Sequence, residues 1–157
     1  MGLFSTPSAR AETGSEDPWR LHCAAHELGH HVVWTQLGFE VTQVAVTGRG
    51  RDVEGQTRLS DGAKNLTSPD RCRDYLIGLL AGREADIRWA RHTGRRYREC
   101  HSQGDLAVYR QVRRHEWVRD LSDRQLRDQA KRLVAAEWAR IVRLTPQLAR
   151  DGHIKPS

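Results

Sequence analysis

Hydrophobic positions recur at helical spacing along the first clearly patterned segment, residues 18–38. Asp17-Pro18 predicts the start of a helix, because the carboxylate accepts from free backbone N–H groups and proline needs none in the first turn. Gly38 predicts its end. The spacing predicts a helix of about 20 residues with one buried face. The apolar positions are Leu21, Ala24, Ala25, Leu28, Val32 and Val33.

A different pattern follows this helix. Residues 39–47 and 53–59 are rich in β-branched and aromatic side chains, and Gly48-Arg49-Gly50 lies between them. Two such runs around a glycine-containing turn predict a β-hairpin. The polar, glycine-bearing segment 60–70 predicts a loop.

Helical spacing returns in the second half of the chain. Ser68-Pro69-Asp70 predicts the start of a second helix that runs to about residue 92. Its apolar positions are Cys72, Tyr75, Leu76, Leu79, Leu80, Ala85 and Trp89. A third helix is predicted over 103–116. A fourth begins at Ser122 and is interrupted at Pro146; its apolar positions are Leu126, Ala130, Leu133, Val134, Trp138 and Ile141.

These elements predict a mainly helical α+β domain with a small antiparallel β-sheet. The length of 157 residues suits one domain. Residues 1–15 are rich in Ser, Thr, Gly and Pro and predict a flexible leader, 16–150 the folded domain, and 151–157 a C-terminal tail.

The net charge and the distribution of arginines bear on whether nucleic acid is a partner. The net charge of +6 is compatible with nucleic acid or acidic lipid as a partner. The arginines are scattered, however, and only Lys64, Lys131 and Lys155 are lysine, a usage that we ascribe to a GC-rich bacterial genome. A nucleic-acid-binding protein remains an alternative, with 91–98 and 110–114 as its basic patches, but we do not expect nucleic acid to be the partner.

Cysteine usage and hydropathy indicate the compartment. Cys23, Cys72 and Cys100 are odd in number and have no C-x-x-C spacing, which is typical of a reducing compartment. No stretch approaches the roughly 20 apolar residues of a membrane-spanning helix, and the N-terminus has no signal-peptide pattern. We therefore expect a cytoplasmic protein with no membrane span.

The sequence His26-Glu27-Leu28-Gly29-His30 lies within the first predicted helix. Histidines at i and i+4 share one helix face, so both imidazoles can reach one metal ion. Glu27 is placed to take a proton from a water molecule whose pKa zinc has lowered. The pattern predicts a zinc site that performs metal-assisted hydrolysis. His22 and His31 are expected to support this site or to lie at the surface.

Spacing alone leaves the third metal ligand open. The pattern H-E-x-x-H-x-x-G-x-x-H fails, because Val33 and Gln36 stand where its glycine and third histidine should be. Glu84 and Asp86 on the second helix and Asp105 near the start of the third are the candidates. Asp105 also fits a helix-capping role, three residues after Ser102.

Four segments resemble the FtsH family of AAA+ metalloproteases. Residues 24–33 (AAHELGHHVV) are similar to its H-E-A-G-H-A-V-V helix, 41–59 to its strand, turn and G-Y-T strand, and 79–86 (LLAGREAD) to its L-G-G-R-A-A-E-E helix. Residues 104–106 (GDL) resemble its N-D-L segment, whose aspartate binds zinc. The resemblance implies a zincin-like peptidase domain in which His26, His30 and Asp105 bind zinc and Glu27 is the general base.

The departures from that family shape the functional prediction. The chain has no Walker-type nucleotide loop, no transmembrane segment precedes the domain, and Ala81 and Asp86 replace the family's usual Gly and Glu. We therefore predict a zinc-dependent metalloendopeptidase, a hydrolase that cleaves unfolded or flexible polypeptides. An edge strand of the hairpin 39–59 would hold the substrate, and a separate ATPase unfoldase is a candidate partner. The alternative is a catalytically silent binding or regulatory module, which the intact Glu27 disfavours.

Overall fold

The computed structural model of the protein describes residues 17–96 and 102–156. The predicted leader 1–15 and the segment 97–101, which includes Cys100, lie outside these residues. The described elements are α1 (Pro18–Gln36), β1 (Val41–Thr47), the 3-10 turn η1 (Gly50–Asp52), β2 (Glu54–Leu59), α2 (Pro69–Thr93), α3 (Gln103–Val112), α4 (Asp123–Ala136), α5 (Trp138–Asp151) and β3 (His153–Ile154). The predicted α+β class is confirmed.

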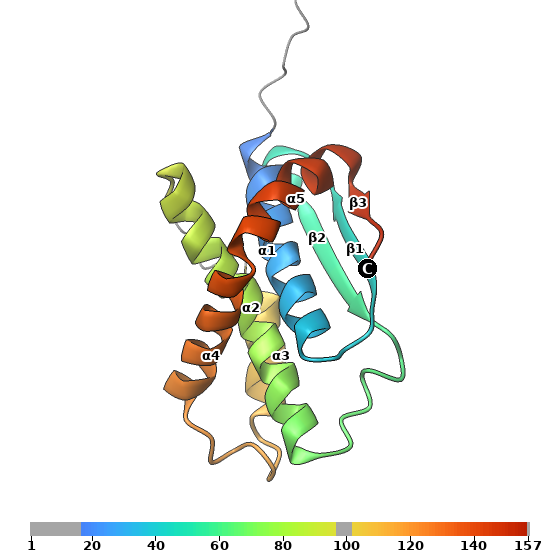
Figure 1. Ribbon diagram of the computed structural model, residues 1–157, viewed down its shortest axis with the longest axis vertical. Coiled ribbons are helices and arrows are strands. Elements are labelled where there is room, and N and C mark those ends of the chain that lie inside the picture. Colours follow the sequence, from blue (N-terminus) through green and yellow to red (C-terminus); the bar gives the residue numbers. More distant parts are fainter. Residues whose placement is uncertain (1–16, 97–101, 157) are drawn as a thin grey trace, which may run out of the picture.

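Helix α1 runs through the middle of the molecule. The sheet lies on one side of it, and α2 and α5 pack against its other sides (Figure 1). Every residue from His22 to Trp34 is buried. The prediction of one buried face was therefore wrong, because the sheet covers one side of α1 and helices α2 and α5 cover its other sides. Its predicted ends are confirmed: Asp17 accepts a hydrogen bond from the Trp19 N–H (2.9 Å), and Gly38 has a φ of +78°.

Small residues bring α1 and α2 into close contact. A Cβ atom on Gly29 would lie 2.6 Å from the Cβ of Ala85 and 2.7 Å from the carbonyl oxygen of Ala81. A Cβ atom on Gly78 would overlap the indole ring of Trp34. Glycine at both positions is therefore needed for the two helices to pack at this distance.

The sheet has the strand order β2-β1-β3, and both pairs are antiparallel. Val41 pairs with Leu59 in the predicted hairpin, and Val44 pairs with Ile154 of β3. The segment 151–157, predicted as a tail, therefore contains a strand. A strand of two residues is too short to show a pattern in the sequence, and its pairing with β1 depends on where α5 ends. With β1 paired on both sides, β2 is an edge strand.

The C-terminal helices differ from the prediction. Helix α3 ends at Val112, earlier than predicted, and the expected fourth helix is two helices that meet at Glu137. Pro146 lies inside α5, so the predicted interruption there was wrong. The physical reason is packing: α4 packs against α2 whereas α5 packs against α1, so the chain changes direction at Glu137.

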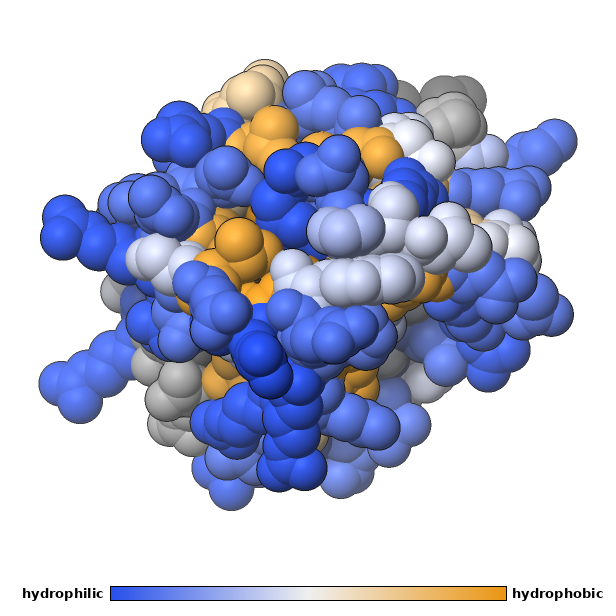
Figure 2. All heavy atoms as spheres, turned by 90° about the horizontal axis from the view of Figure 1, so that it is seen from below, coloured by the Kyte–Doolittle hydropathy of each residue, from blue (hydrophilic) through white to orange (hydrophobic). Residues whose placement is uncertain are grey.

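One face of the molecule is mainly polar. Hydrophilic residues cover most of the face shown in Figure 2, and hydrophobic residues reach it in small separate areas. Within 17–96 and 102–156, no helix has both the length and the apolar character needed to cross a bilayer.

Candidate metal centre

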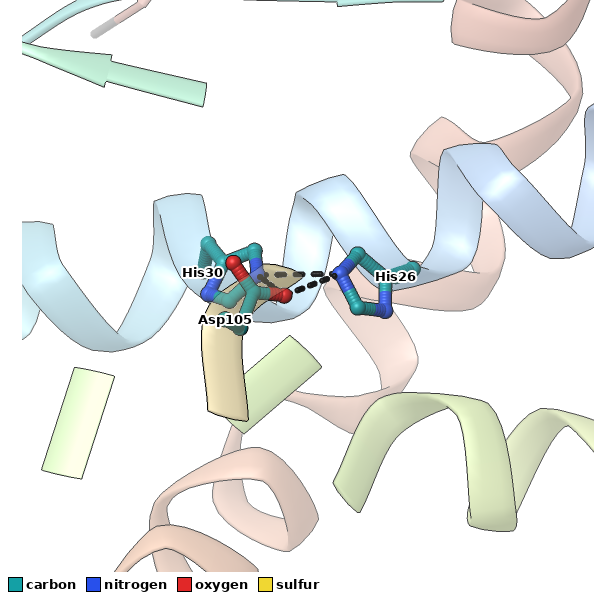
Figure 3. A group of neighbouring side chains, drawn as sticks. All are labelled: His26, His30 and Asp105. Carbon is teal, nitrogen blue, oxygen red and sulfur yellow. Dashed lines mark hydrogen bonds and ion pairs between the residues drawn. The ribbon is translucent and has the colours of Figure 1, made fainter. Parts of the chain in front are cut away.

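His26 and His30 project from the same side of α1 toward the first turn of α3 (Figure 3). Their spacing of four residues places them one helical turn apart, and their Nε2 atoms are 3.0 Å from each other. Both side chains are buried, with the residues 5% and 3% exposed. The two imidazoles thus point at one position, as the H-E-x-x-H spacing predicts.

Asp105 completes the group from the first turn of α3. Its Oδ2 atom is 2.9 Å from the Nε2 atom of His26 and 3.1 Å from that of His30. A tetrahedral zinc ion with bonds of about 2.0–2.1 Å sets its ligand atoms about 3.3 Å apart, so small adjustments would admit one. Three ligand atoms therefore converge from two helices, and the group could hold a metal ion.

The other nitrogen of each imidazole is held on the side away from Asp105. The Nδ1 atom of His26 is 2.8 Å from Asp86 Oδ2, and the Nδ1 atom of His30 is 2.8 Å from the carbonyl oxygen of Gly78. A carboxylate and a carbonyl can only accept here, so each Nδ1 carries the proton and donates it. In the neutral rings, both Nε2 lone pairs then face Asp105.

Asp86 orients the site and does not face the metal position. It is fully buried, its Oδ2 accepts from the Ser102 hydroxyl (3.0 Å), and its Oδ1 lies 3.1 Å from His22 Nε2. The sequence made Asp86 a candidate third ligand, but its carboxylate contacts Nδ1 of His26 and not Nε2, so it does not face the metal position. Ser102, the residue before α3, makes no side-chain hydrogen bond to the first turn of that helix. His22 is buried and supports the site through Asp86.

Glu84 lies on another face of α2. It lines a cleft with Arg127 and Lys131 of α4, whereas Asp86 faces α1. Two residues along a helix point about 200° apart. Glu84 therefore is not brought to the two histidines, and Asp105 is the candidate that is.

The negative charges around the histidines favour a cation. Burial favours the neutral form of His26, but the carboxylates of Asp86 and Asp105 outweigh it and raise its pKa well above the usual value. Burial opposes ionisation of Asp105 in turn, but His30 and His26 hold its pKa far below the usual range. The same attraction acts on a metal ion at this position.

Glu27 lies in a pocket of about 470 Å³ beside the histidines. The Thr57 hydroxyl is 2.7 Å from Glu27 Oε2 and 3.0 Å from its carbonyl oxygen, so it holds the side chain against β2. A Cβ atom on Gly55 would lie 2.6 Å from Glu27 Cγ, so only glycine lets the edge strand come this close. The pocket is lined by Cys23, His26, Glu27, Arg51, Val53, Glu54, Gly55, Gly104 and Asp105.

Sequence reasoning gave no separate role to several residues that shape this site. Thr57, Gly55, Gly78 and Gly82 were not assigned to it by spacing. A Cβ atom on Gly82 would lie 2.7 Å from His26 Nε2 and would also meet His30. Residues 55–57 (GQT) and 81–83 (AGR) belong to the segments that resemble the FtsH family, but the resemblance does not say what the residues touch, and Gly78 lies outside it.

Two further side chains of α1 are excluded as ligands. Cys23 lines the pocket, but burial and the charge of Glu27 raise the pKa of its thiol to about 12, so it is not a thiolate. His31 is buried on another side of α1, and burial lowers its pKa to about 4. It contacts the Thr35 hydroxyl at 3.4 Å, and so it is neither at the surface nor at the metal position.

No family model matches the chain, and a search of curated proteins finds no match either. The resemblance to the FtsH family therefore stays a prediction that rests on the four segments named above.

Proposed function

We propose that the protein is a zinc-dependent endopeptidase, with His26, His30 and Asp105 as ligands and Glu27 as general base. One observation carries the proposal. The three ligand atoms lie within 3.1 Å of one another, and both Nδ1 atoms are already committed to acceptors. Three converging acceptor atoms need a positive charge among them, which either a proton on His26 or a metal ion can supply.

The donor set suits zinc. Two neutral imidazoles and one carboxylate are a common set for catalytic zinc and leave a coordination position open. Zinc held there would lower the pKa of a water molecule and polarise the carbonyl of a substrate. The orienting contacts of Asp86 and Gly78 keep the imidazoles in the tautomer that ligation requires.

Glu27 supplies the proton transfer. Its carboxylate opens on the same pocket as His26 and Asp105, and Thr57 restrains its rotation. A carboxylate in this place accepts a proton from the attacking water and can return it to the amine that leaves. The buried setting strengthens this interaction because little water competes for the carboxylate.

The substrate side of the site is the edge strand β2. Glu54 and Gly55 of β2, with Val53 before them, line the same pocket as Asp105 and Gly104. An extended chain can pair with the free edge of a strand through its backbone, which selects for an extended conformation more than for a particular sequence. The substrate class is therefore an unfolded or flexible polypeptide.

The cellular setting is part of the proposal. Cys23 and Cys72 are both free and buried, which suits a reducing compartment such as the bacterial cytoplasm. A separate ATPase that unfolds substrates is the partner that would extend the range of this peptidase to folded proteins.

Metal analysis and a peptide-library cleavage assay test the function. Wild-type protein should bind one zinc ion and cleave peptides, and a chelator should abolish cleavage. Glu27→Gln should keep zinc and lose turnover, because an amide fills the space but accepts no proton. A preference for Fe(II), which also binds two histidines and a carboxylate, or zinc binding without any cleavage would contradict the endopeptidase.

The ligand assignment has its own test. Asp105→Ala should lose zinc affinity sharply, whereas Glu84→Ala should retain it, since Glu84 faces α4. Full zinc occupancy in Asp105→Ala would show that another group is the third ligand.

A further inference from the structure

Helix α2 lines a second cleft, on the side turned toward α4. The cleft has a volume of about 260 Å³ and lies between the two helices. It is lined by Arg83, Glu84, Ile87, Arg88, Arg91, Arg127, Asp128, Lys131 and Val134. Gly82 and Asp86 of the same helix face α1 and the histidines. The cleft is therefore separate from the metal centre.

The cleft concentrates positive charge. Its five cationic side chains and two carboxylates leave a surplus of three positive charges in one small volume. Glu84 lies at the base, where burial raises its pKa against the pull of Arg83, Lys131, Arg127 and Arg91. Like charges placed this close repel one another in the folded protein. A bound anion would relieve the repulsion.

Several of these cations have donors to spare. Arg83 pairs with Glu84 at 3.4 Å, and Arg88 lies over the ring of Trp138 at 5.1 Å. Within the described part of the chain, the side chains of Arg91, Arg127 and Lys131 make no hydrogen bond or ion pair. Their N–H groups at the mouth of the cleft are available to a ligand.

The chemistry of the lining favours phosphate over other anions. A guanidinium group binds two phosphate oxygens at once, and each phosphate group brings up to two negative charges. A carboxylate peptide brings one charge per residue and would need a longer surface to neutralise three. A nucleic-acid duplex would meet mainly the exposed Arg91, Arg127 and Lys131 and would leave the more buried Arg83 and Arg88 unused. A short chain of phosphate groups fits both the charge and the volume.

We propose that the cleft between α2 and α4 binds the oligophosphate group of a small ligand. The ligand is either an inorganic oligophosphate or a nucleotide with two or three phosphates, because both present the same chain of oxygens. Arg91, Arg127 and Lys131 bind the outer phosphates, and Arg83 and Arg88 lie deeper between the helices.

Calorimetric titration of the zinc-loaded protein with tripolyphosphate, ATP and AMP tests the proposal. Tripolyphosphate and ATP should bind with 1:1 stoichiometry and AMP much more weakly, and affinity should fall as salt rises. Equal affinity for tripolyphosphate and ATP identifies the phosphate chain as the whole ligand, and tighter binding of ATP identifies a nucleotide. AMP binding as tightly as tripolyphosphate, or no binding of any of the three, would overturn the proposal.

Matched variants locate the binding. The double variant Arg127→Gln/Lys131→Gln should lose about tenfold or more in affinity, because two charge-assisted contacts are removed. Arg132→Gln removes an exposed arginine of α4 outside the cleft and should leave affinity unchanged. An equal loss in both would indicate a diffuse charge effect and overturn the proposal, as would a DNA duplex that binds more tightly than tripolyphosphate.

Two further variants distinguish anion binding in the cleft from damage to the fold and from binding at the metal centre. Glu84→Gln removes a negative charge from the base of the cleft and should raise affinity, a gain that damage to the fold would not produce. Asp105→Ala, titrated without added zinc beside zinc-free wild-type protein, separates the cleft from the metal centre, because oligophosphates also bind zinc. Its affinity for tripolyphosphate should be unchanged, and a loss there would place the anion at the metal centre and overturn the proposal.

Discussion

At the residue scale, His26 is held by a carboxylate that faces away from the candidate metal position. Asp86 holds Nδ1 of His26 at 2.8 Å. In Asp86→Asn, the amide N–H group can turn toward Nδ1 and favour the tautomer that cannot bind metal through Nε2. We expect zinc affinity to fall about 10–100-fold, as for other partners of metal-binding histidines.

Competition with a zinc chelator measures this effect. Asp74→Asn makes the same chemical change elsewhere on α2, where Asp74 pairs with Arg73, and should leave zinc affinity unchanged. If Asp86→Asn bound zinc as tightly as the wild-type protein, the orienting role would be wrong.

Gly82 provides the space for both imidazoles. In Gly82→Ala, the new methyl group would meet His26 and His30, and overpacking of this kind costs about 1–3 kcal/mol. We expect weaker zinc binding and a lower midpoint of unfolding. Gly62→Ala is the control, because a Cβ atom there has open space within 4 Å. Equal zinc binding in the two variants would show that the rings can move aside.

At the scale of elements, Asp17 ties the start of α1 to the turn that follows β1. Its side chain accepts from the N–H groups of Trp19 (2.9 Å) and Gly50 (2.6 Å). Asp17→Ala should cost about 0.5–2 kcal/mol of unfolding free energy at neutral pH, the range for loss of a helix cap. Urea unfolding measures this, with the exposed Asp61→Ala as control.

The cost should depend on pH. The Gly50 hydrogen bond lowers the pKa of Asp17 below its ordinary 3.8 in the folded protein. A lowered carboxylate pKa contributes stability above the unfolded value, and this is lost as pH falls through the folded pKa. The difference between wild type and Asp17→Ala should therefore shrink in acid below 3.8. A difference that stayed constant would show that the charge of Asp17 is not involved.

At the scale of the whole molecule, the proposed peptidase would be limited in its substrates by the arrangement of α1 and β2. A chain that pairs with the edge of β2 must offer free backbone N–H and C=O groups, which folded proteins have committed to their own structure. We expect the zinc-loaded protein to cleave destabilised proteins and flexible peptides without ATP, and to leave stable folded domains intact.

A matched pair of substrates tests this expectation. One is a stably folded protein, and the other is a destabilised variant with the same cleavage sites; both are incubated without nucleotide. Selective loss of the destabilised variant is the expected result. Equal cleavage of both would contradict the substrate class, and cleavage of neither would favour a silent binding module.

Local patterns in the sequence determined most of the helices, the hairpin and half of the metal centre. The positions of His26, Glu27 and His30 follow from i, i+1 and i+4 on one helix, and the ends of α1 and α2 follow from capping residues next to proline or glycine. These features depend on neighbours within one turn, so they can be predicted without knowledge of the fold. The sequence also named Asp105, but only as one of three candidates and through resemblance.

Only the tertiary structure decided which carboxylate faces the histidines. Asp105 is 75 residues from His30 along the chain, and its position depends on how α3 packs against α2. The packing of the helices also turns Asp86 toward Nδ1 of His26 and Glu84 toward α4. It divides the last predicted helix at Glu137 and brings β3 to β1. Contacts between distant segments depend on the shapes of all the packed side chains together, and no local period encodes them.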